Sequence, residues 1–496
     1  MKANKLLIIL FTTAILTSCS DDFLDKKKLG SLTTESFFVT ENDAFQAVVA
    51  AYSDLKDYRY TWTIWAFGDV LSDDATYSGS DADVQAYAQM EAFQFPTDNG
   101  RILGRWQILY RGINKANQAI EGITRMDNTL FKTQNKNRLL GEALFLRAYY
   151  YHELVRVFGD VVLFDHTPTI SDKGAKRAPV AEVYALIEKD LTTAASYLPA
   201  VNSTSYIKKT DAGRITRGSA NAMLARVYLY QKKYAECKNA CLEVFKDGYE
   251  LEKDYGYVFT LAGEHCKESI LEITNYNSTT QSAATTNNGN FHVLMMLPFG
   301  STYGYGINQP RQALADAFDA AGDVIRKDAT LLTAADLQTW EAPADFAKLA
   351  RNRTGYYNQK YYLKPAERST EIRNNPVNIR LIRLSEVYLT YAEACVKGSP
   401  ADDITAREYL NKVRRRVNLG DNTTDSGDAL FNAILKERRL ELAMEGHRYF
   451  DMVRTGKAHD AFISKGNFRE GISNLMPIPQ AEIDLSGGTL SELVSI

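Results

Sequence analysis

The sequence predicts a mainly α-helical protein, built as a scaffold of helical hairpins with a long loop-rich face. Three observations lead to this prediction. Apolar residues recur every three or four positions in eight segments, as on the buried side of a helix. Two of the hairpins share one order of small and apolar residues. Three long stretches between the helical segments are rich in turn-forming and aromatic residues.

The N-terminus has the layout of an export signal. Lys2 and Lys5 precede a largely apolar run from Leu6 to Leu16, which is shorter than the about 20 residues that span a membrane. Residues 16–19, Leu-Thr-Ser-Cys, resemble the bacterial lipobox, in which the cysteine carries lipid. We therefore expect residues 1–18 to be a signal peptide and Cys19 to anchor the protein. The alternative is a soluble secreted protein with a chance cysteine.

Helices are predicted wherever the period of three to four residues persists. The segments are 43–55, 102–123, 139–158, 180–198, 217–245, 384–396, 405–417 and 429–444. Gly159 is expected to end the third helix and Gly446 the last, because glycine readily takes the left-handed conformation that follows a helix.

Two segments show the spacing of small and apolar residues that is typical of a tetratricopeptide hairpin. In residues 221–245, small and apolar positions fall where such a unit places them, and the second helix reads small-x3-small-x2-apolar. Residues 391–413 repeat the same spacing after a connecting loop at 400–403. The two matches favour a tetratricopeptide-like scaffold, while an ordinary helix bundle stays the alternative.

Three long stretches are predicted to form surface loops: 72–100, 276–310 and 339–378. Loops of this length are uncommon unless they are functional or disordered. Their aromatic residues argue against disorder, because disordered segments are poor in aromatic side chains. The whole chain contains 29 Tyr, 22 Phe and 4 Trp, more rings than a core alone needs.

Composition and motifs exclude several functional classes. The formal net charge is -3 with both signs interspersed, so no basic surface for nucleic acid is expected. The six histidines and the remaining four cysteines show no metal-ligand spacing, and no phosphate-binding loop or nucleophile elbow is present. We therefore expect no cofactor, no metal-binding motif and no catalytic motif. A surface calcium at the acidic stretches 81–83 and 421–428 stays an open alternative.

One predicted helix is rich in charge. Glu437, Glu441 and Glu445 follow one another at intervals of four residues, with Arg438 and Arg448 three residues from a glutamate. Such clustered carboxylates suit acid–base chemistry, but the same spacing suits structural ion pairs. We favour the structural interpretation.

The chain resembles the SusD/RagB-type nutrient-binding lipoproteins of the outer membrane. Five segments carry the resemblance, in the order found in that family: 139–162, 383–394, 409–415, 437–451 and 476–480. The resemblance implies a tetratricopeptide-like scaffold with a loop-rich ligand face that caps a SusC-like TonB-dependent transporter. It also implies that the glutamate and arginine helix is structural. We expect regions 19–275 and 276–496 to be the N-terminal and C-terminal parts of the fold.

The resemblance and the aromatic loops together predict a surface protein that binds an oligosaccharide and passes it on unchanged. Sugar rings need flat aromatic side chains for their C–H faces and amides or carboxylates for their hydroxyls. Among loop residues, the predicted ligand contacts are Tyr77, Asp81, Tyr87, Asn288, Phe291, Tyr303, Tyr305 and Trp340. Tyr60, Trp62 and Trp65 border a helix and are assigned to the core.

Three alternatives remain open at this point. The cargo can be non-glycan, for example a peptide, because the motifs identify a scaffold rather than a ligand. A glycoside hydrolase would need two carboxylates about 5 to 9 Å apart, and nothing in the sequence selects such a pair. A purely structural scaffold that recruits other surface proteins would need no aromatic loops.

Overall fold

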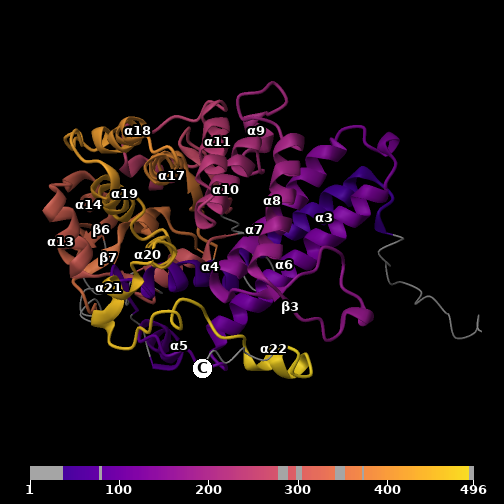
Figure 1. Cartoon of the computed structure of the whole chain (residues 1–496), viewed down its shortest axis with the longest axis horizontal. Coiled ribbons are helices and arrows are strands. Elements are labelled where there is room, and N and C mark those ends of the chain that lie inside the picture. The colour runs from indigo at the N-terminus through magenta and orange to yellow at the C-terminus, as the bar shows by residue number, and fades with distance from the viewer. Residues whose placement is uncertain are drawn as a thin grey trace, which may run out of the picture.

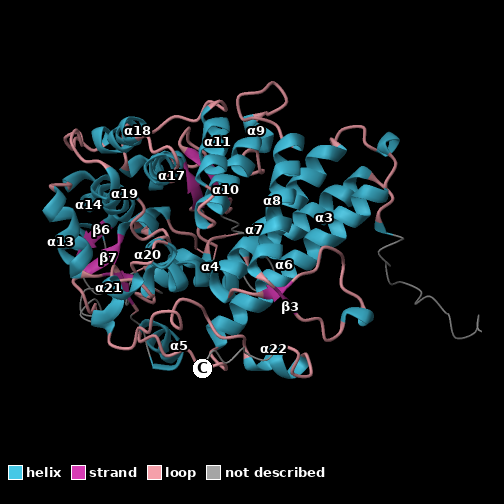
Figure 2. Ribbon diagram, viewed as in Figure 1, coloured by secondary structure: helices cyan, strands magenta, loops and turns pink. Residues whose placement is uncertain are grey.

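A computed structural model describes residues 37–77, 81–276, 289–297, 304–340, 352–370 and 374–490. Helices dominate this part of the chain, and the strands are short (Figure 2). The prediction of a mainly α fold is therefore confirmed. No helix among the described residues is both long and apolar enough to cross a membrane. Cys19 lies outside the described residues.

The scaffold is an array of helices that pack in sequence order, each on the next. It runs from α3 at one side of Figure 1 to α18 at the other. The members are α3 (Glu41–Ser53), α6 (Gly100–Arg125), α7 (Lys136–Phe158), α8 (Val180–Tyr197), α10 (Arg217–Tyr230), α11 (Tyr234–Phe245), α17 (Leu384–Lys397), α18 (Asp403–Arg416) and α19 (Gly427–Glu441).

These helices confirm the periodic segments that the sequence indicates, and α10–α11 and α17–α18 form the two predicted hairpins. Gly159 ends α7 with a φ of +71°, as expected. The expectation for Gly446 is wrong. Helix α19 ends earlier, at Glu441, and the backbone N–H of Gly446 donates to the buried Asp69 carboxylate at 2.9 Å.

The predicted loops contain regular structure of their own. The first includes an eleven-residue helix, α5 (Asp81–Glu91). The others include α12 (Phe291–Met296), α15 (Ala334–Trp340) and the 3-10 helix η8 (Gln359–Tyr361). The remaining short helices are α4 (Tyr58–Trp65), α9 (Lys208–Asp211), α13 (Gln312–Ala321), α14 (Val324–Thr330), α20 (Arg448–Arg454), α21 (Ala458–Phe462) and α22 (Gln480–Leu485).

Within the described residues, four antiparallel pairs of short strands join separate segments of the chain. The pairs are β1 (Ala75–Thr76) with β5 (Gln309–Pro310), β2 (Val161–Val162) with β3 (Arg177–Ala178), β4 (Ser269–Ile273) with β8 (Ile379–Arg383), and β6 (Leu331–Thr333) with β7 (Tyr356–Asn358). Strand β5 also packs against β7, so the first and last of these pairs are neighbours.

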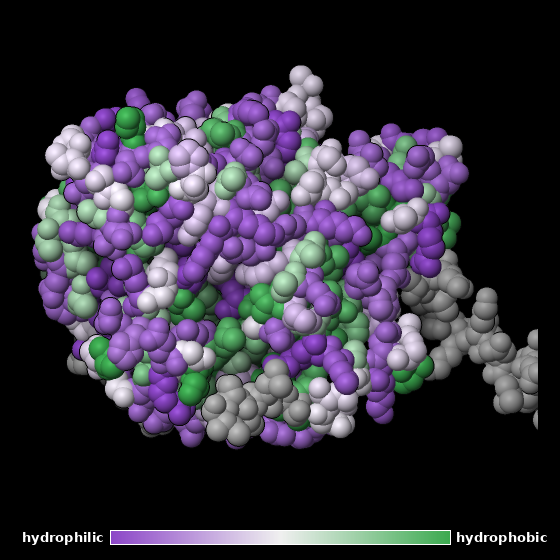
Figure 3. Space-filling model, viewed as in Figure 1, coloured by the Kyte–Doolittle hydropathy of each residue, from purple (hydrophilic) through white to green (hydrophobic). Residues whose placement is uncertain are grey.

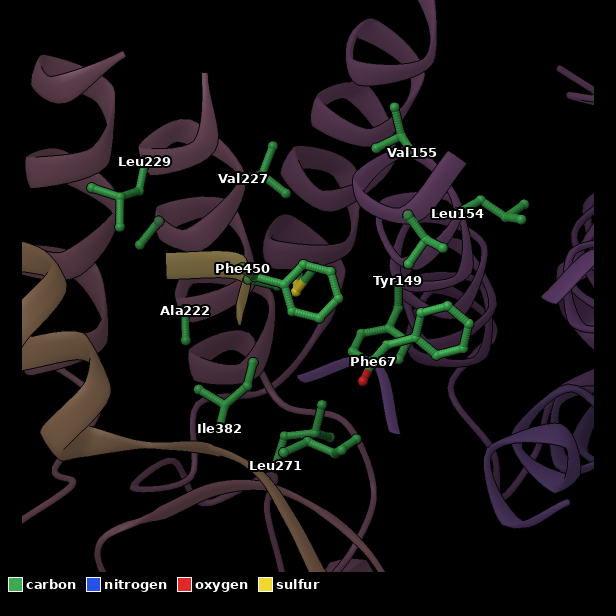
Figure 4. Close-up of a cluster of buried hydrophobic side chains, with 14 of the residues drawn as sticks. Phe67, Tyr149, Leu154, Val155, Ala222, Val227, Leu229, Leu271, Ile382 and Phe450 are labelled. Atoms are coloured by element: carbon green, nitrogen blue, oxygen red, sulfur yellow. The ribbon is translucent and has the colours of Figure 1, made fainter. Parts of the chain in front are cut away.

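One large apolar core joins the helical array to the segments that follow it. Figure 4 shows part of it, where side chains from α7, α10, β4, β8 and α20 converge. Full burial of each large apolar side chain contributes about 1.5 to 3 kcal/mol. The core crosses residue 275, since β4 pairs with β8 and α11 packs on α17. The division into 19–275 and 276–496 stays a prediction, with the two regions sharing this core.

Candidate functional site: an aromatic face between short helices

Helix α4 presents two aromatic rings on one side. Asp57 caps its N-terminus by accepting a hydrogen bond from the Arg59 backbone N–H at 2.9 Å. Tyr58 and Trp62 lie four residues apart and therefore on one face of the helix, with ring centroids 4.9 Å apart in an edge-on arrangement. Tyr58 is 46% exposed and Trp62 is half-buried, so both rings reach the surface.

Helix α12 brings a third ring to the same place. Phe291, its first residue, stacks on Trp62 with centroids 4.9 Å apart and an interplanar angle of 26°. The next residue, His292, hydrogen-bonds through Nδ1 to the backbone carbonyl of Thr61 at 2.9 Å. Nδ1 therefore bears the proton, and burial lowers the pKa of His292 to about 4. We call Tyr58, Trp62 and Phe291 the aromatic platform.

The aromatic platform is fixed from below. Asn290 caps α12 by accepting from the Val293 N–H at 3.3 Å, and its own amide donates to the Val377 carbonyl at 2.7 Å. The backbone N–H of Asn290 donates to the Asn375 carbonyl at 2.7 Å. These bonds order the platform before any ligand arrives, which lowers the entropic cost of binding.

A second pair of rings comes from α15 and the segment after η8. Trp340 stacks on Tyr362 with centroids 5.5 Å apart, and the Lys364 ammonium lies 4.9 Å from the Trp340 ring centroid. Both rings pack over a small apolar cluster of Leu332, Leu337 and Tyr357, and both stay partly exposed. Tyr362 also packs against the cluster beneath α12, which places this ring pair next to that helix.

Tyr77 lies at the end of β1 with a cation over its ring. The Arg353 guanidinium is 4.6 Å from the ring centroid, and the Arg353 backbone N–H donates to the Gln309 side chain on β5 at 3.0 Å. Tyr77 is half-buried against the main core.

Tyr305 follows α12. Its backbone N–H donates to the Leu294 carbonyl at 3.2 Å, and the residue is 37% exposed.

The structure thus leaves four of the eight predicted contact residues with exposed or half-exposed rings: Tyr77, Phe291, Tyr305 and Trp340. Tyr87 lies in α5 with no exposed surface, tilted against Trp65 in the core. Asp81 begins α5, and its side chain is outside the described part, as are residues Asn288 and Tyr303.

Sequence reasoning missed Tyr58 and Trp62. Tyr60 and Trp65 are buried, as predicted, and Trp62 packs against the main core, but it is only half-buried and also meets Phe291. The four-residue spacing of Tyr58 and Trp62 was the available signal, because it puts them on one helix face while Tyr60 turns inward. The Phe291 partner, far along the chain, gave no signal in the sequence.

Polar residues dominate the face of the molecule in Figure 3, and apolar residues gather around a hollow near its middle. Within the described residues no cluster of three or more His, Cys, Asp or Glu side chains is arranged to hold a metal ion. The exposed and half-buried rings described above are the groups that we consider for ligand contact.

The glutamate cluster is buried and ion-paired, as the structural interpretation predicts. Glu441 has no exposed surface and accepts from Arg383 at 2.9 Å, Arg326 at 3.1 Å and Arg416. Burial alone would raise the pKa of Glu441, but the three guanidinium groups, Arg416 foremost, hold it well below its usual value. This carboxylate is unreachable for a substrate in the structure.

Two of the predicted ion pairs are wrong. Arg438 pairs with Asp451 at 3.0 Å, and Arg448 pairs with Asp73 at 2.8 Å. Glu445 instead accepts from Lys360 at 2.7 Å and from Arg383 at 2.8 Å. We call Glu268, Glu437, Glu441, Glu445, Asp323, Arg326, Arg383, Arg416 and Lys360 the buried ion network.

The helical array with its aromatic loop segments is a mainly α scaffold, and comparison with known proteins gives its family. A model described as the SusD family matches residues 332–492. A second, described as "Starch-binding associating with outer membrane", matches residues 22–229. The SusD-like protein P2 of Formosa agariphila is 27% identical over 517 residues, which covers 97% of each chain.

Solved structures agree. A laminarin-binding SusD-like protein superposes with a TM-score of 0.76 at 29% identity, covering 90% of this chain and 98% of that one. Surface glycan-binding protein A from Bacteroides fluxus gives 0.75 at 25% identity, covering 90% and 97%. The chain belongs to the SusD/RagB-like family.

Proposed function

We propose that this protein binds oligosaccharides at the cell surface and delivers them, chemically unchanged, to a SusC-like TonB-dependent transporter of the outer membrane. The observation that carries the proposal is the aromatic platform, three rings at the surface held by hydrogen bonds beneath them. Flat rings match the apolar C–H faces of sugars. The names of the relatives support a glycan cargo, since two similar structures are a laminarin-binding and a surface glycan-binding protein.

The proposed contacts are the aromatic platform together with Tyr77, Tyr305 and Trp340. Asp81, Asn288 and Tyr303 remain proposed contacts from the sequence alone. We leave Tyr87 out of the contact surface because it has no exposed atoms in this conformation. A non-glycan cargo such as a peptide remains the alternative, and the same binding experiment decides between them.

The test is a glycan array, followed by isothermal titration with the best oligosaccharide. Tyr58→Ala and Phe291→Ala should each weaken binding about tenfold or more, because one good stacking contact contributes about 1 to 3 kcal/mol. A thermal melt of each variant shows that the fold persists. Mass analysis of the recovered oligosaccharide should find it intact. Normal binding by both variants would place the ligand elsewhere.

Anchoring and delivery require separate experiments. Cys19→Ala should move the protein from the membrane fraction to the soluble exported fraction, because lipid on this residue is the proposed anchor. Purification of the unaltered protein in mild detergent should recover a TonB-dependent transporter with it. Membrane retention of the Cys19→Ala variant would remove the lipid anchor from the proposal and leave the binding site untouched.

A further inference from the structure

Two rings of the proposed binding face have a cation over them that no carboxylate neutralises. The Arg353 guanidinium lies 4.6 Å from the Tyr77 centroid, and the Lys364 ammonium lies 4.9 Å from the Trp340 centroid. Both cationic residues are exposed. Among the described residues, no Asp or Glu oxygen comes within 4.0 Å of either charged group.

The cation beside the platform ring Tyr58 is paired, in contrast to these two. Arg59 lies 5.8 Å from the Tyr58 centroid, but its guanidinium also meets Asp57 at 2.8 Å. Arg311, close to β1, pairs with Glu91. Glu367 is the described carboxylate nearest to Lys364 along the chain, and it accepts from the Lys364 backbone N–H at 2.9 Å instead of from the ammonium. The charges of Arg353 and Lys364 are therefore available to a ligand.

Hydrogen bonds to the Asn352 side chain hold the turn that carries Arg353 in place. The Asn352 side chain accepts from the N–H groups of Thr354 and Gly355, at 2.7 and 2.8 Å, which closes a tight turn around Arg353. Gly355 has a φ of +87°, a conformation that favours glycine. A charge on an ordered turn loses little freedom when it binds, so its contribution to affinity is larger.

A cation over a ring changes what that ring can bind. The covered face is closed to the apolar face of a neutral sugar, whereas a carboxylate or sulfate on the sugar meets the cation directly. Arginine in particular matches planar or tetrahedral oxyanions with two parallel hydrogen bonds. We infer that the cargo is an anionic glycan, with carboxylate or sulfate groups that contact Arg353 and Lys364. This inference rests on the proposed glycan-binding function.

Matched ligand pairs test the inference with the full exported chain. One pair is an oligogalacturonate hexasaccharide and its neutral methyl ester. The other is laminarihexaose and its sulfated derivative. In titrations at low ionic strength, at least one anionic member should bind tenfold or more tightly than its neutral partner. High salt should reduce that advantage, because salt screens exposed charges. The pair that responds distinguishes a carboxylate from a sulfate ligand.

Variants then assign the effect to the two cations. Arg353→Gln and Lys364→Gln should each reduce the anionic preference at least threefold, with unchanged melting. Lys232→Gln, at an exposed lysine in the α10–α11 turn, is the matched control and should have no effect. If neutral members bind as tightly as anionic ones, the anionic inference is wrong and the glycan-binding proposal stands. If no glycan binds to the folded protein, both are wrong.

Discussion

The buried ion network and the loop face use the same residue types in different ways. We call the segments that carry the aromatic platform, Tyr77, Tyr305, Trp340, Arg353 and Lys364 the loop face. In the network, Arg383 has carboxylate partners in Glu268, Glu441 and Glu445, and its side chain has almost no exposed surface. On the loop face, Arg353 lies over a tyrosine ring and faces water. The residue type alone therefore does not show whether an arginine stabilises the fold or contacts a ligand. Its burial and its partners distinguish the two roles.

The two regions are also connected. Lys360 lies in η8, between β7 and Tyr362, and its buried ammonium donates to Glu445 at 2.7 Å. The network therefore holds the base of the segment that presents Tyr362 and Lys364. Damage to the network should lower stability first, whereas damage to the loop face should lower binding and leave stability nearly unchanged.

The largest expected effect comes from Glu441→Ala. Removal of this carboxylate leaves Arg326, Arg383 and Arg416 with fewer buried partners, which should lower the free energy of unfolding by about 3 to 5 kcal/mol. Urea denaturation measures the loss. The control is Glu243→Ala, an exposed residue paired with Lys246, which should change stability by about 0.5 kcal/mol or less. A loss below about 1 kcal/mol for Glu441→Ala would show that the network is not structural.

A pH-dependent effect on stability is expected at Asp69. Burial raises the pKa of Asp69 to about 7, although Asn308 and the Gly446 N–H donate hydrogen bonds to its carboxylate. The folded state therefore binds this proton more tightly than the unfolded chain does. Its stabilising contribution is complete below about pH 4 and is lost as the pH rises through about 7.

Asp69→Asn should remove that dependence, because an amide stays neutral at every pH. The stability of the variant relative to the unaltered protein should rise by about 1.4 kcal/mol per pH unit between about pH 4 and 7 and then level off. Denaturation at several pH values measures this difference. Asp428→Asn, at a highly exposed aspartate, serves as the control. Parallel stability profiles for Asp69→Asn and the unaltered protein would contradict a proton held at Asp69.

The helical scaffold could be predicted from the sequence because its signals are local. Each helix repeats its apolar residues with its own period, and the α10–α11 hairpin carries its spacing within one short segment. Helix α5 was missed inside a predicted loop. Its apolar residues, such as Val84 and Tyr87, do not form a clear stripe, so periodicity gave little indication of it.

The binding face was predictable only in part, because its contacts join distant segments. Phe291 could be selected as a loop aromatic, but its partner Trp62 lies in another part of the chain and was assigned to the core. The partners of Glu441 were missed for the same reason, since Arg326 and Arg383 are 115 and 58 residues away. The composition of a segment shows which residue types are abundant in it. Contacts between segments that are far apart in the sequence become visible only in the folded structure.

The smallest expected effect on stability comes from Tyr305, and the chain offers a closely matched control. Tyr305 and Tyr197 are both 37% exposed, but Tyr305 follows α12 on the loop face and Tyr197 ends α8 on the helical array. Replacement of either by alanine should change the free energy of unfolding by the same small amount, about 1 kcal/mol or less, because both side chains are partly exposed to the same extent.

The affinity for the oligosaccharide should differ between the two variants. Tyr305→Ala should weaken oligosaccharide binding about tenfold, which corresponds to about 1.4 kcal/mol, while Tyr197→Ala should bind normally. Isothermal titration with one oligosaccharide, beside a thermal melt of each variant, measures both quantities. Equal affinities for the two variants would exclude Tyr305 from the contact surface. A loss of affinity in Tyr197→Ala alone would show that the ligand binds the helical array instead of the loop face.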